Sequence, residues 1–221
     1  MKNSYHYILC IVGLFATLQS LGQTPVPVKK DPDHRIVFQN KLVTIIYPRI
    51  LPGDTTPYHI HETPSVFLIM RDTRVFDQPY GKPGETFFSA KGETWYNEFY
   101  KKQTHRIANI DSVDHQSILI ELSNEPKKKY PDPIPGLPKP EYFERVRIYP
   151  LRIESGSSFD LKTSTTPAVF VAYKGNVSMK EKGKTFGLKQ GDIKWVEESG
   201  NIIFTNEEPE AVEGYVYEIR K

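Results

Sequence analysis

The chain has 221 residues, enough for one large domain or for two small ones that each bury a core. Lysine and arginine (29) nearly balance aspartate and glutamate (27), so the net charge of +2 gives no reason to expect a nucleic-acid partner. The 18 prolines, 14 glycines and 12% aromatic residues favour many short strands and turns over long helices.

The first 22 residues have the pattern of a secretory signal peptide. Lys2 gives a positive start, residues 7–16 are apolar, and the small residues Ser20 and Gly22 precede a cleavage point before Gln23. The chain is therefore expected to be exported, periplasmic or secreted, with no stable membrane span after cleavage; the alternative is an uncleaved anchor. The single cysteine, Cys10, lies inside this segment, so the mature chain would contain no disulfide and no cysteine-bound metal.

The remaining chain reads as two strand-rich regions separated by a proline-rich segment. Residues 23–34 are polar and proline-containing and are expected to form a flexible lead-in. In residues 35–123, β-branched or alternating runs at 42–47, 65–70 and 117–122 predict strands. Residues 124–142 contain six prolines and are expected to form a semi-rigid linker, whose run of lysines is a solvated charge run. Strand patterns resume in residues 143–221.

The two strand-rich regions repeat one another. Arg49, Ile50 and Gly53 recur 103 residues later as Arg152, Ile153 and Gly156, and residues 63–67 resemble residues 166–170 at the same offset. At an offset of 97 residues, further identities pair Asn109 with Asn206 and Glu121 with Glu218. The repeat predicts two copies of one β unit, residues 35–123 and 143–221, joined by the linker.

The histidines indicate a metal site in the first copy. His59 and His61 are two residues apart, and alternate residues of a strand project from the same face. A third ligand must then come from another strand, and His105 is the candidate. His34, in the lead-in, and His115, after a turn, are expected to lie at the surface.

These residues resemble the two motifs of the cupin superfamily. Gly53 is followed after five residues by His59-x-His61, and His105 is followed four residues later by Asn109. The resemblance implies an all-β fold of two tandem double-stranded β-helix, jelly-roll-like barrels, a bicupin, with a metal in the mouth of the first.

The chain departs from the cupin pattern at two places. Ser65 and Val66 stand where many cupins carry a glutamate ligand, and Tyr100 and Lys102 replace the proline and glycine expected before the third histidine. A three-histidine site without glutamate occurs in the superfamily, among others in the Fe(II) thiol dioxygenases. Such a site would hold one divalent transition metal, and Fe(II), Zn(II), Ni(II), Cu(II) and Mn(II) remain open.

Other residues near the motifs are candidates for supporting roles. Glu62 is a substitute ligand only if a bulge re-aims it, because it follows His61 directly and should face the opposite side. Trp95 recurs as Trp195, which favours core packing. The remaining candidates for contacts with the metal ligands or with a bound molecule are Tyr58, Ser65, Tyr96, Arg106 and Asn109.

The second copy lacks the metal ligands. Lys162, Ser164 and Ile202 stand at the positions of the three histidines, so this copy is expected to be structural, with Lys162 facing solvent. The sequence thus leaves three functions open. The first is a dioxygenase-like metal enzyme acting on a small organic molecule; the others are a non-catalytic metal- or ligand-binding module and a metal-independent sugar isomerase or epimerase. A monomer or a homodimer is compatible with each.

Overall fold

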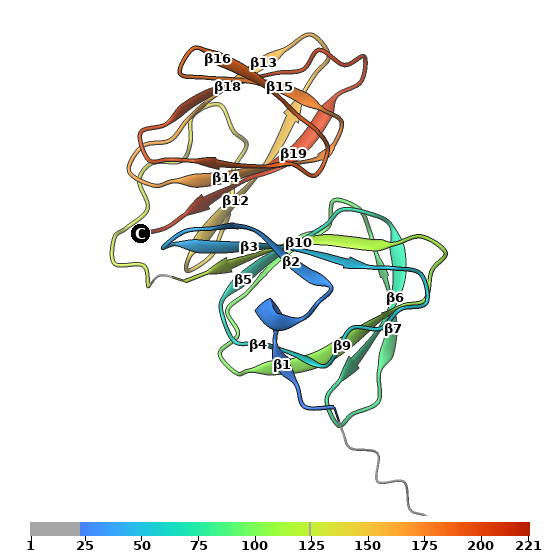
Figure 1. Ribbon diagram of the computed structural model, residues 1–221. Coiled ribbons are helices and arrows are strands. Elements are labelled where there is room, and N and C mark those ends of the chain that lie inside the picture. Colours follow the sequence, from blue (N-terminus) through green and yellow to red (C-terminus); the bar gives the residue numbers. More distant parts are fainter. Residues whose placement is uncertain (1–22, 124) are drawn as a thin grey trace, which may run out of the picture.

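The computed structural model describes residues 23–123 and 125–221, so the expected signal peptide and Cys10 lie outside the described residues. The described residues form strands, turns and one short 3-10 helix, as the alternating apolar pattern predicts. No helix among them is long and apolar enough to cross a membrane. The strands make four sheets, two in each half of the chain (Figure 1).

Residues 26–122 form the first pair of sheets. One sheet has the spatial order β1 (Val26–Pro27), β4 (His59–His61), β9 (Gln103–Asn109), β6 (Thr73–Pro79) and β7 (Glu85–Ser89). The other has the order β2 (His34–Gln39), β3 (Val43–Ile50), β10 (His115–Leu122), β5 (Ser65–Ile69) and β8 (Thr94–Asn97). Apart from the hairpins β2–β3 and β6–β7, consecutive strands alternate between the two sheets, which together enclose a jelly-roll barrel.

Residues 141–219 form the second pair. One sheet has the order β11 (Glu141–Tyr142), β12 (Val146–Ile153), β19 (Val212–Ile219), β14 (Ala168–Lys174) and β17 (Ile193–Val196). The other has the order β13 (Ser158–Lys162), β18 (Asn201–Thr205), β15 (Val177–Glu181) and β16 (Lys184–Leu188). The fold is therefore all-β with two tandem barrels, as the resemblance implied.

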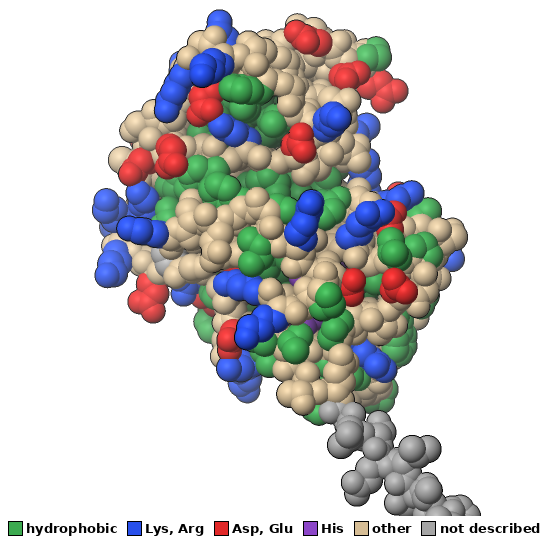
Figure 2. Space-filling view, viewed as in Figure 1, with side chains coloured by type: hydrophobic (Ala, Val, Ile, Leu, Met, Phe, Trp, Pro, Cys, Tyr) green, Lys and Arg blue, Asp and Glu red, His purple; other side chains and the backbone are tan. Residues whose placement is uncertain are grey.

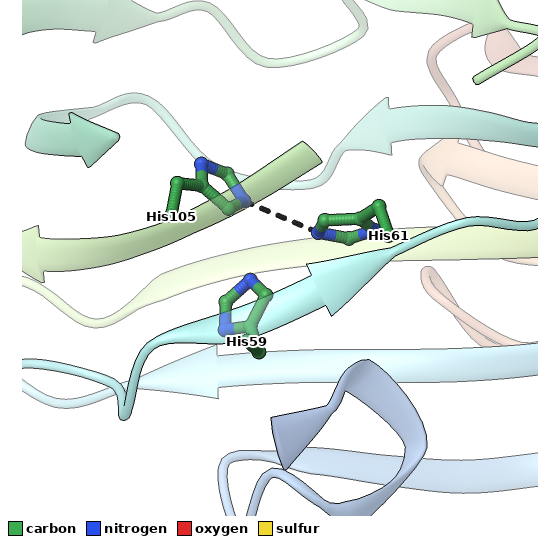
Figure 3. Close-up of side chains that lie close together, drawn as sticks. All are labelled: His59, His61 and His105. Atoms are coloured by element: carbon green, nitrogen blue, oxygen red, sulfur yellow. Dashed lines mark hydrogen bonds between the residues drawn. The ribbon is translucent and has the colours of Figure 1, made fainter. Parts of the chain in front are cut away.

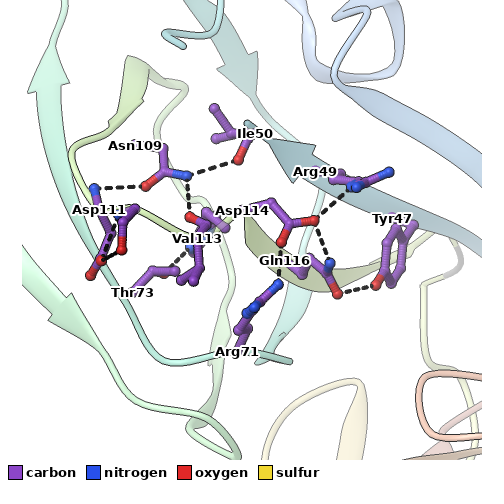
Figure 4. A network of polar contacts seen from close by, with 12 residues as sticks. Tyr47, Arg49, Ile50, Arg71, Thr73, Asn109, Asp111, Val113, Asp114 and Gln116 are labelled. Carbon is purple, nitrogen blue, oxygen red and sulfur yellow. Dashed lines mark hydrogen bonds and ion pairs between the residues drawn. The ribbon is translucent and has the colours of Figure 1, made fainter. Parts of the chain in front are cut away.

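The two barrels are built alike in detail. The Asn109 side chain donates hydrogen bonds to the carbonyl oxygens of Ile50 (2.9 Å) and Val113 (2.7 Å), as Figure 4 shows. Asn206 makes the equivalent bonds to Ile153 (2.9 Å) and Glu210 (2.8 Å). Asn109 was a candidate for the site, but these bonds give it a structural role: it ties the end of one strand to the next turn.

The barrels pack against each other through an apolar interface. In β3, Ile45 lies in a buried cluster shared with the second barrel, whereas the next residue, Ile46, packs inside the first barrel. Both faces of this strand are therefore buried, which explains its nearly continuous apolar sequence. The second barrel contributes Val169, Val171 and other residues of β12, β14 and β19 to the shared cluster. Hydrophobic side chains are visible along this junction in Figure 2.

Residues 23–34 are built into the first barrel and do not form the flexible lead-in that was expected. They contain β1, which pairs with β4, and the 3-10 helix η1 (Val28–Lys30). The reason is apolar burial: Val28 is buried against Ile46 and Leu119 inside the barrel. Polar composition predicted a loop, but a single apolar side chain and strand pairing anchor the segment.

The proline-rich segment was expected to form a semi-rigid linker, but it is anchored in the second barrel. Ile134 lies in the core of the second barrel, and its backbone N–H bonds the Tyr149 hydroxyl at 3.2 Å. Arg147, which is 1% exposed, donates to the carbonyl oxygens of Pro131 (3.0 Å) and Asp132 (3.3 Å) while pairing with Glu218. The segment thus fills part of the interior of the second barrel.

Candidate metal centre

The structure brings His59, His61 and His105 together on the inner wall of the first barrel. β4 carries the first two on one face, and β9 pairs with it so that His105 stands opposite His59. The Nε2 atoms of His61 and His105 are 3.1 Å apart, and one ligating nitrogen from each of the three rings lies within 4.8 Å of the others. Figure 3 shows the three rings facing a common point. His59 and His61 are 1% and 4% exposed.

Two carboxylates hold the outer nitrogens of this triad. Nδ1 of His59 lies 2.7 Å from Oδ2 of Asp31, and Nδ1 of His105 lies 2.8 Å from Oδ1 of Asp77. A carboxylate at Nδ1 fixes the ring and favours the tautomer that leaves Nε2 free to bind a metal, an arrangement common around metal-bound histidines. The geometry of the protein residues therefore fits a metal ligand set.

Asp31 is a buried charge that two histidines share. Its Oδ2 also lies 3.1 Å from Nδ1 of His34, and its carboxylate is fully buried. Both ring nitrogens thus lie within ion-pair distance of one carboxylate oxygen. Burial acts to raise the pKa of Asp31, but His34 and His59 outweigh it and keep that pKa well below its usual range. Asp31 is thus ionised at neutral pH.

Burial favours the uncharged form of His59 and His61. It lowers the pKa of His61 to about 2, with contributions from the neighbouring His105 and His59. It also lowers the pKa of His59, although the contact with Asp31 opposes that change. Imidazole binds a metal only in its neutral form, so these two ligands need not lose a proton when a metal enters at neutral pH.

The triad forms one wall of a cavity of about 340 Å³ in the first barrel. Phe67 and Trp95 stack with ring centres 4.9 Å apart along another wall, and Phe99 stacks on His61 at 5.3 Å. Trp95, which was expected to pack in the core, is 40% exposed and lines this cavity. In Figure 2 a small area of histidine is visible in the lower barrel, flanked by hydrophobic side chains.

His34 and His115 were expected at the surface, but both are 7% exposed and line the same cavity. His34 begins β2 and contacts Asp31 as described above. His115 begins β10, and its Nδ1 lies 2.7 Å from the hydroxyl of Thr73. Burial lowers the pKa of His115 to about 4, so this ring is neutral at neutral pH.

Several predicted supporting residues lie away from the triad. Glu62 faces outward and pairs with Lys102 at 2.5 Å, as its position after His61 predicted. The Ser65 hydroxyl donates to the Thr63 carbonyl at 2.8 Å, which forms a local turn. The two residues therefore contribute nothing to the ligand set.

The aromatic and basic candidates also make other contacts. The hydroxyl of Tyr96 bonds Glu98, which in turn pairs with Arg145 of the second barrel at 2.9 Å. Arg106 donates to Gln78 at 2.9 Å and lies over the ring of Tyr58, with 4.8 Å between its guanidinium carbon and the ring centre. Tyr96 thus belongs to the barrel junction. The side chains of Arg106 and Tyr58 contact each other and make no hydrogen bond or ring contact with the three histidines.

Sequence reasoning missed the residues that do support the triad. Thr73, Val75 and Asp77 share one face of β6, so alternation from a buried valine gives a local signal for Asp77 and Thr73. Asp31 carries no such signal, because it lies in an irregular turn between η1 and β2. Its contact with His59 exists only once the lead-in is folded into the barrel.

The second barrel has apolar side chains where the first has two of its triad residues, because Leu161, and not Lys162 as the repeat suggested, stands opposite Ile202 as His59 stands opposite His105. Leu161 and Ile202 face each other across β13 and β18, and both are fully buried. Lys162 is exposed and pairs with Asp160 at 2.8 Å, as a solvent-facing position predicted. The described residues of this barrel therefore offer no three-histidine ligand set.

No family model and no curated protein matches the sequence. Solved structures match the fold. The chain is similar to AerE from Microcystis aeruginosa, with 15% identity, a TM-score of 0.66, and coverage of 89% of this chain and 98% of that one. It is also similar to a salicylate 1,2-dioxygenase from Pseudaminobacter salicylatoxidans, with 12% identity, a TM-score of 0.62, and coverage of 87% and 78%.

A third similar structure is an oxalate decarboxylase, with 13% identity, a TM-score of 0.54, and coverage of 81% of this chain and 69% of that one. The salicylate dioxygenase and the oxalate decarboxylase are cupin-fold proteins. The four-sheet topology and these matches show that the chain is a cupin-fold protein with two tandem barrels.

Proposed function

We propose that this chain is an exported, metal-dependent cupin enzyme that carries out a dioxygenase-like reaction on a small organic molecule. The observation that carries the proposal is the convergence of His59, His61 and His105 at a cavity wall, with Asp31 and Asp77 at the outer nitrogens of two of them. A barrel that serves only as a scaffold does not need such a set of side chains. In the second barrel, apolar residues occupy the same place.

The donor set suits one divalent transition metal. Neutral imidazole nitrogens bind Fe(II), Zn(II), Ni(II), Cu(II) and Mn(II), and three protein ligands leave positions open for a substrate. When bound, such an ion supplies Lewis-acid or redox chemistry at this wall of the cavity. Phe99 covers His61, and the aromatic pair Phe67 and Trp95 limits the access of water.

The fold and the lining of the cavity guide the choice among reactions. Two similar proteins are a dioxygenase and a decarboxylase, which supports a metal reaction on a small molecule in this fold. The cavity is lined mainly by apolar side chains, whereas a sugar requires many hydrogen-bonding partners, so sugar isomerisation or epimerisation is the weaker reading.

Elemental mass spectrometry of the chain from Gln23, purified without a histidine tag or a chelator, tests the metal site. We expect about one metal per chain, lost in the triple variant His59→Ala, His61→Ala, His105→Ala. His115→Gln is the matched control: it removes a histidine from the same cavity but not from the triad, and it should keep the metal. Metal absent from the unaltered chain after reconstitution would overturn the site.

Oxygen uptake by the metal-loaded chain separates an enzyme from a binding module. An iron-loaded chain that consumes oxygen with small organic substrates, and stops doing so in the triple variant, supports the enzyme. A chain that holds metal stably but never turns over supports non-catalytic binding. Export is tested separately, by expressing the whole chain and determining the N-terminus of the secreted or periplasmic product, which we expect to be Gln23.

A further inference from the structure

The cavity at the triad is poor in permanently charged side chains. Among the described residues that line it, none is a lysine or an arginine, and the carboxylates are those of Asp77 and Glu93. Asp77 is occupied by His105. Glu93 is exposed, and its carboxylate makes no hydrogen bond or ion pair with the described residues, so it adds negative charge at the rim. Apart from a metal held by the triad, a carboxylate or phosphate on a ligand would find no lysine or arginine partner on these walls.

The walls are otherwise apolar and aromatic. Ile50, Ile69, Val75, Ile107 and Leu119 line the cavity together with the stacked pair of Phe67 and Trp95. Burying a charged group against such walls is unfavourable, whereas an apolar body of matching size gains from leaving water. The walls therefore favour the binding of an uncharged group over that of a charged group.

Three polar side chains in the cavity are not used by the triad or its carboxylates: Ser89, Ser117 and His115. Nδ1 of His115 is held by Thr73 at 2.7 Å, and its Nε2 makes no hydrogen bond with the described residues. A threonine hydroxyl can donate or accept, so the neutral ring can present its Nε2 as either an acceptor or a donor. His115 thus offers an adaptable hydrogen bond from a buried ring within a mainly apolar surface.

We propose, building on the function above, that the part of the substrate in contact with these walls is uncharged and largely apolar and has one oxygen-bearing group, and that His115 recognises this group. Recognition of a hydroxyl or carbonyl by a buried neutral imidazole discriminates sharply, because a ligand without the oxygen leaves the imidazole unpaired. His115 is then a specificity-determining residue distinct from the metal ligands, and Thr73 is a positioning residue that acts through it.

Calorimetric binding to the metal-free chain tests the charge preference of the walls, because a bound metal would itself attract a carboxylate. The probes are naphthylmethanol, naphthoate and naphthylmethylammonium, which have similar bodies and differ in charge. We expect naphthylmethanol to bind at least about tenfold more tightly than either charged probe, because burial of an unpaired charge is unfavourable. Equal or tighter binding of naphthoate or naphthylmethylammonium would overturn the proposal.

Variants at His115 test the recognition of the oxygen. In His115→Phe we expect naphthylmethanol to bind about three- to tenfold more weakly, the effect of one hydrogen bond, while methylnaphthalene binds unchanged. His115→Gln should restore part of the affinity for the alcohol, and Thr73→Val should weaken it. An equal loss for both probes, or no loss for either, would refute the role of His115.

The outcome is separable from that of the proposed function. Metal content is measured after reconstitution, whereas the charge preference is measured on the metal-free chain, so neither result depends on the other. Loss of metal with retained discrimination between probes would refute the metal enzyme but keep the ligand class. Normal metal content without discrimination would do the reverse. Circular dichroism of each variant confirms that it is folded.

Discussion

Asp31 gives a test of whether the lead-in is part of the metal centre. The substitution Asp31→Asn keeps the size of the side chain but removes the charge that contacts His59 at 2.7 Å and His34 at 3.1 Å. The carboxylate is fully buried, so solvent does not screen these contacts. We therefore expect the substitution to act on the orientation and basicity of His59.

The expected magnitude follows from the role of such carboxylates. Loss of an outer partner of a metal-bound histidine lowers metal affinity about 10- to 100-fold, which corresponds to about 1.4–2.7 kcal/mol. Asp77→Asn should give a loss of the same order, because Asp77 holds His105 at 2.8 Å in the same way.

The assay is a competition titration of zinc between the chain and a chelator of known affinity. The matched control is Asp33→Asn, two residues away, whose carboxylate has no hydrogen bond or ion pair with the described residues. If Asp31→Asn binds zinc as tightly as Asp33→Asn and the unaltered chain, then Asp31 does not support the site. A loss of affinity without a change in the unfolding curve would show that the effect is local.

Three further outcomes are expected. The pKa of His115 falls on folding from 6.5 to about 4, so this group should lower the stability of the metal-free chain by about 1.4 kcal/mol per pH unit as pH falls through this range. Urea unfolding of His115→Gln should show a correspondingly smaller dependence of the free energy of unfolding on pH. An equal dependence in the variant and the unaltered chain would contradict the assignment. Ile134→Ala should lower the free energy of unfolding by about 2–4 kcal/mol, measured against the exposed control Lys139→Ala, because a buried side chain is truncated. Glu218→Gln should cost about 3–5 kcal/mol in the same measurement, since it leaves Arg147 buried without its carboxylate, and a loss below about 1 kcal/mol would show that the pair contributes little.

The second barrel has a structural role, whereas the first barrel carries the triad. Ile134 and the carbonyl oxygens of the proline-rich segment are held inside that barrel, and Leu161 and Ile202 fill the wall that carries the triad in the first. The second copy, which lacks the ligands, is a packing partner of the first: its sheet buries one face of the first barrel. Ligand binding and structural support are thus divided between two copies of one fold.

The sequence by itself determined the elements and the triad. Strand runs, turn glycines and the repeat are local or periodic signals that predict two copies of one β unit, and the resemblance to the cupin motifs implies that each copy is a barrel. His59-x-His61 and His105 were found because spacing along a strand sets the face on which each side chain lies. None of these inferences needs the position of a distant residue.

Only the tertiary structure decided what surrounds the triad. Asp31, His34 and His115 lie in a turn and at strand ends, where no periodic pattern gives the direction of a side chain. The lead-in and the linker have polar, proline-rich compositions, yet Val28 and Ile134 anchor them in the barrels through contacts with residues far along the chain. Burial and pKa depend on the sum of such distant contacts, which local sequence does not encode.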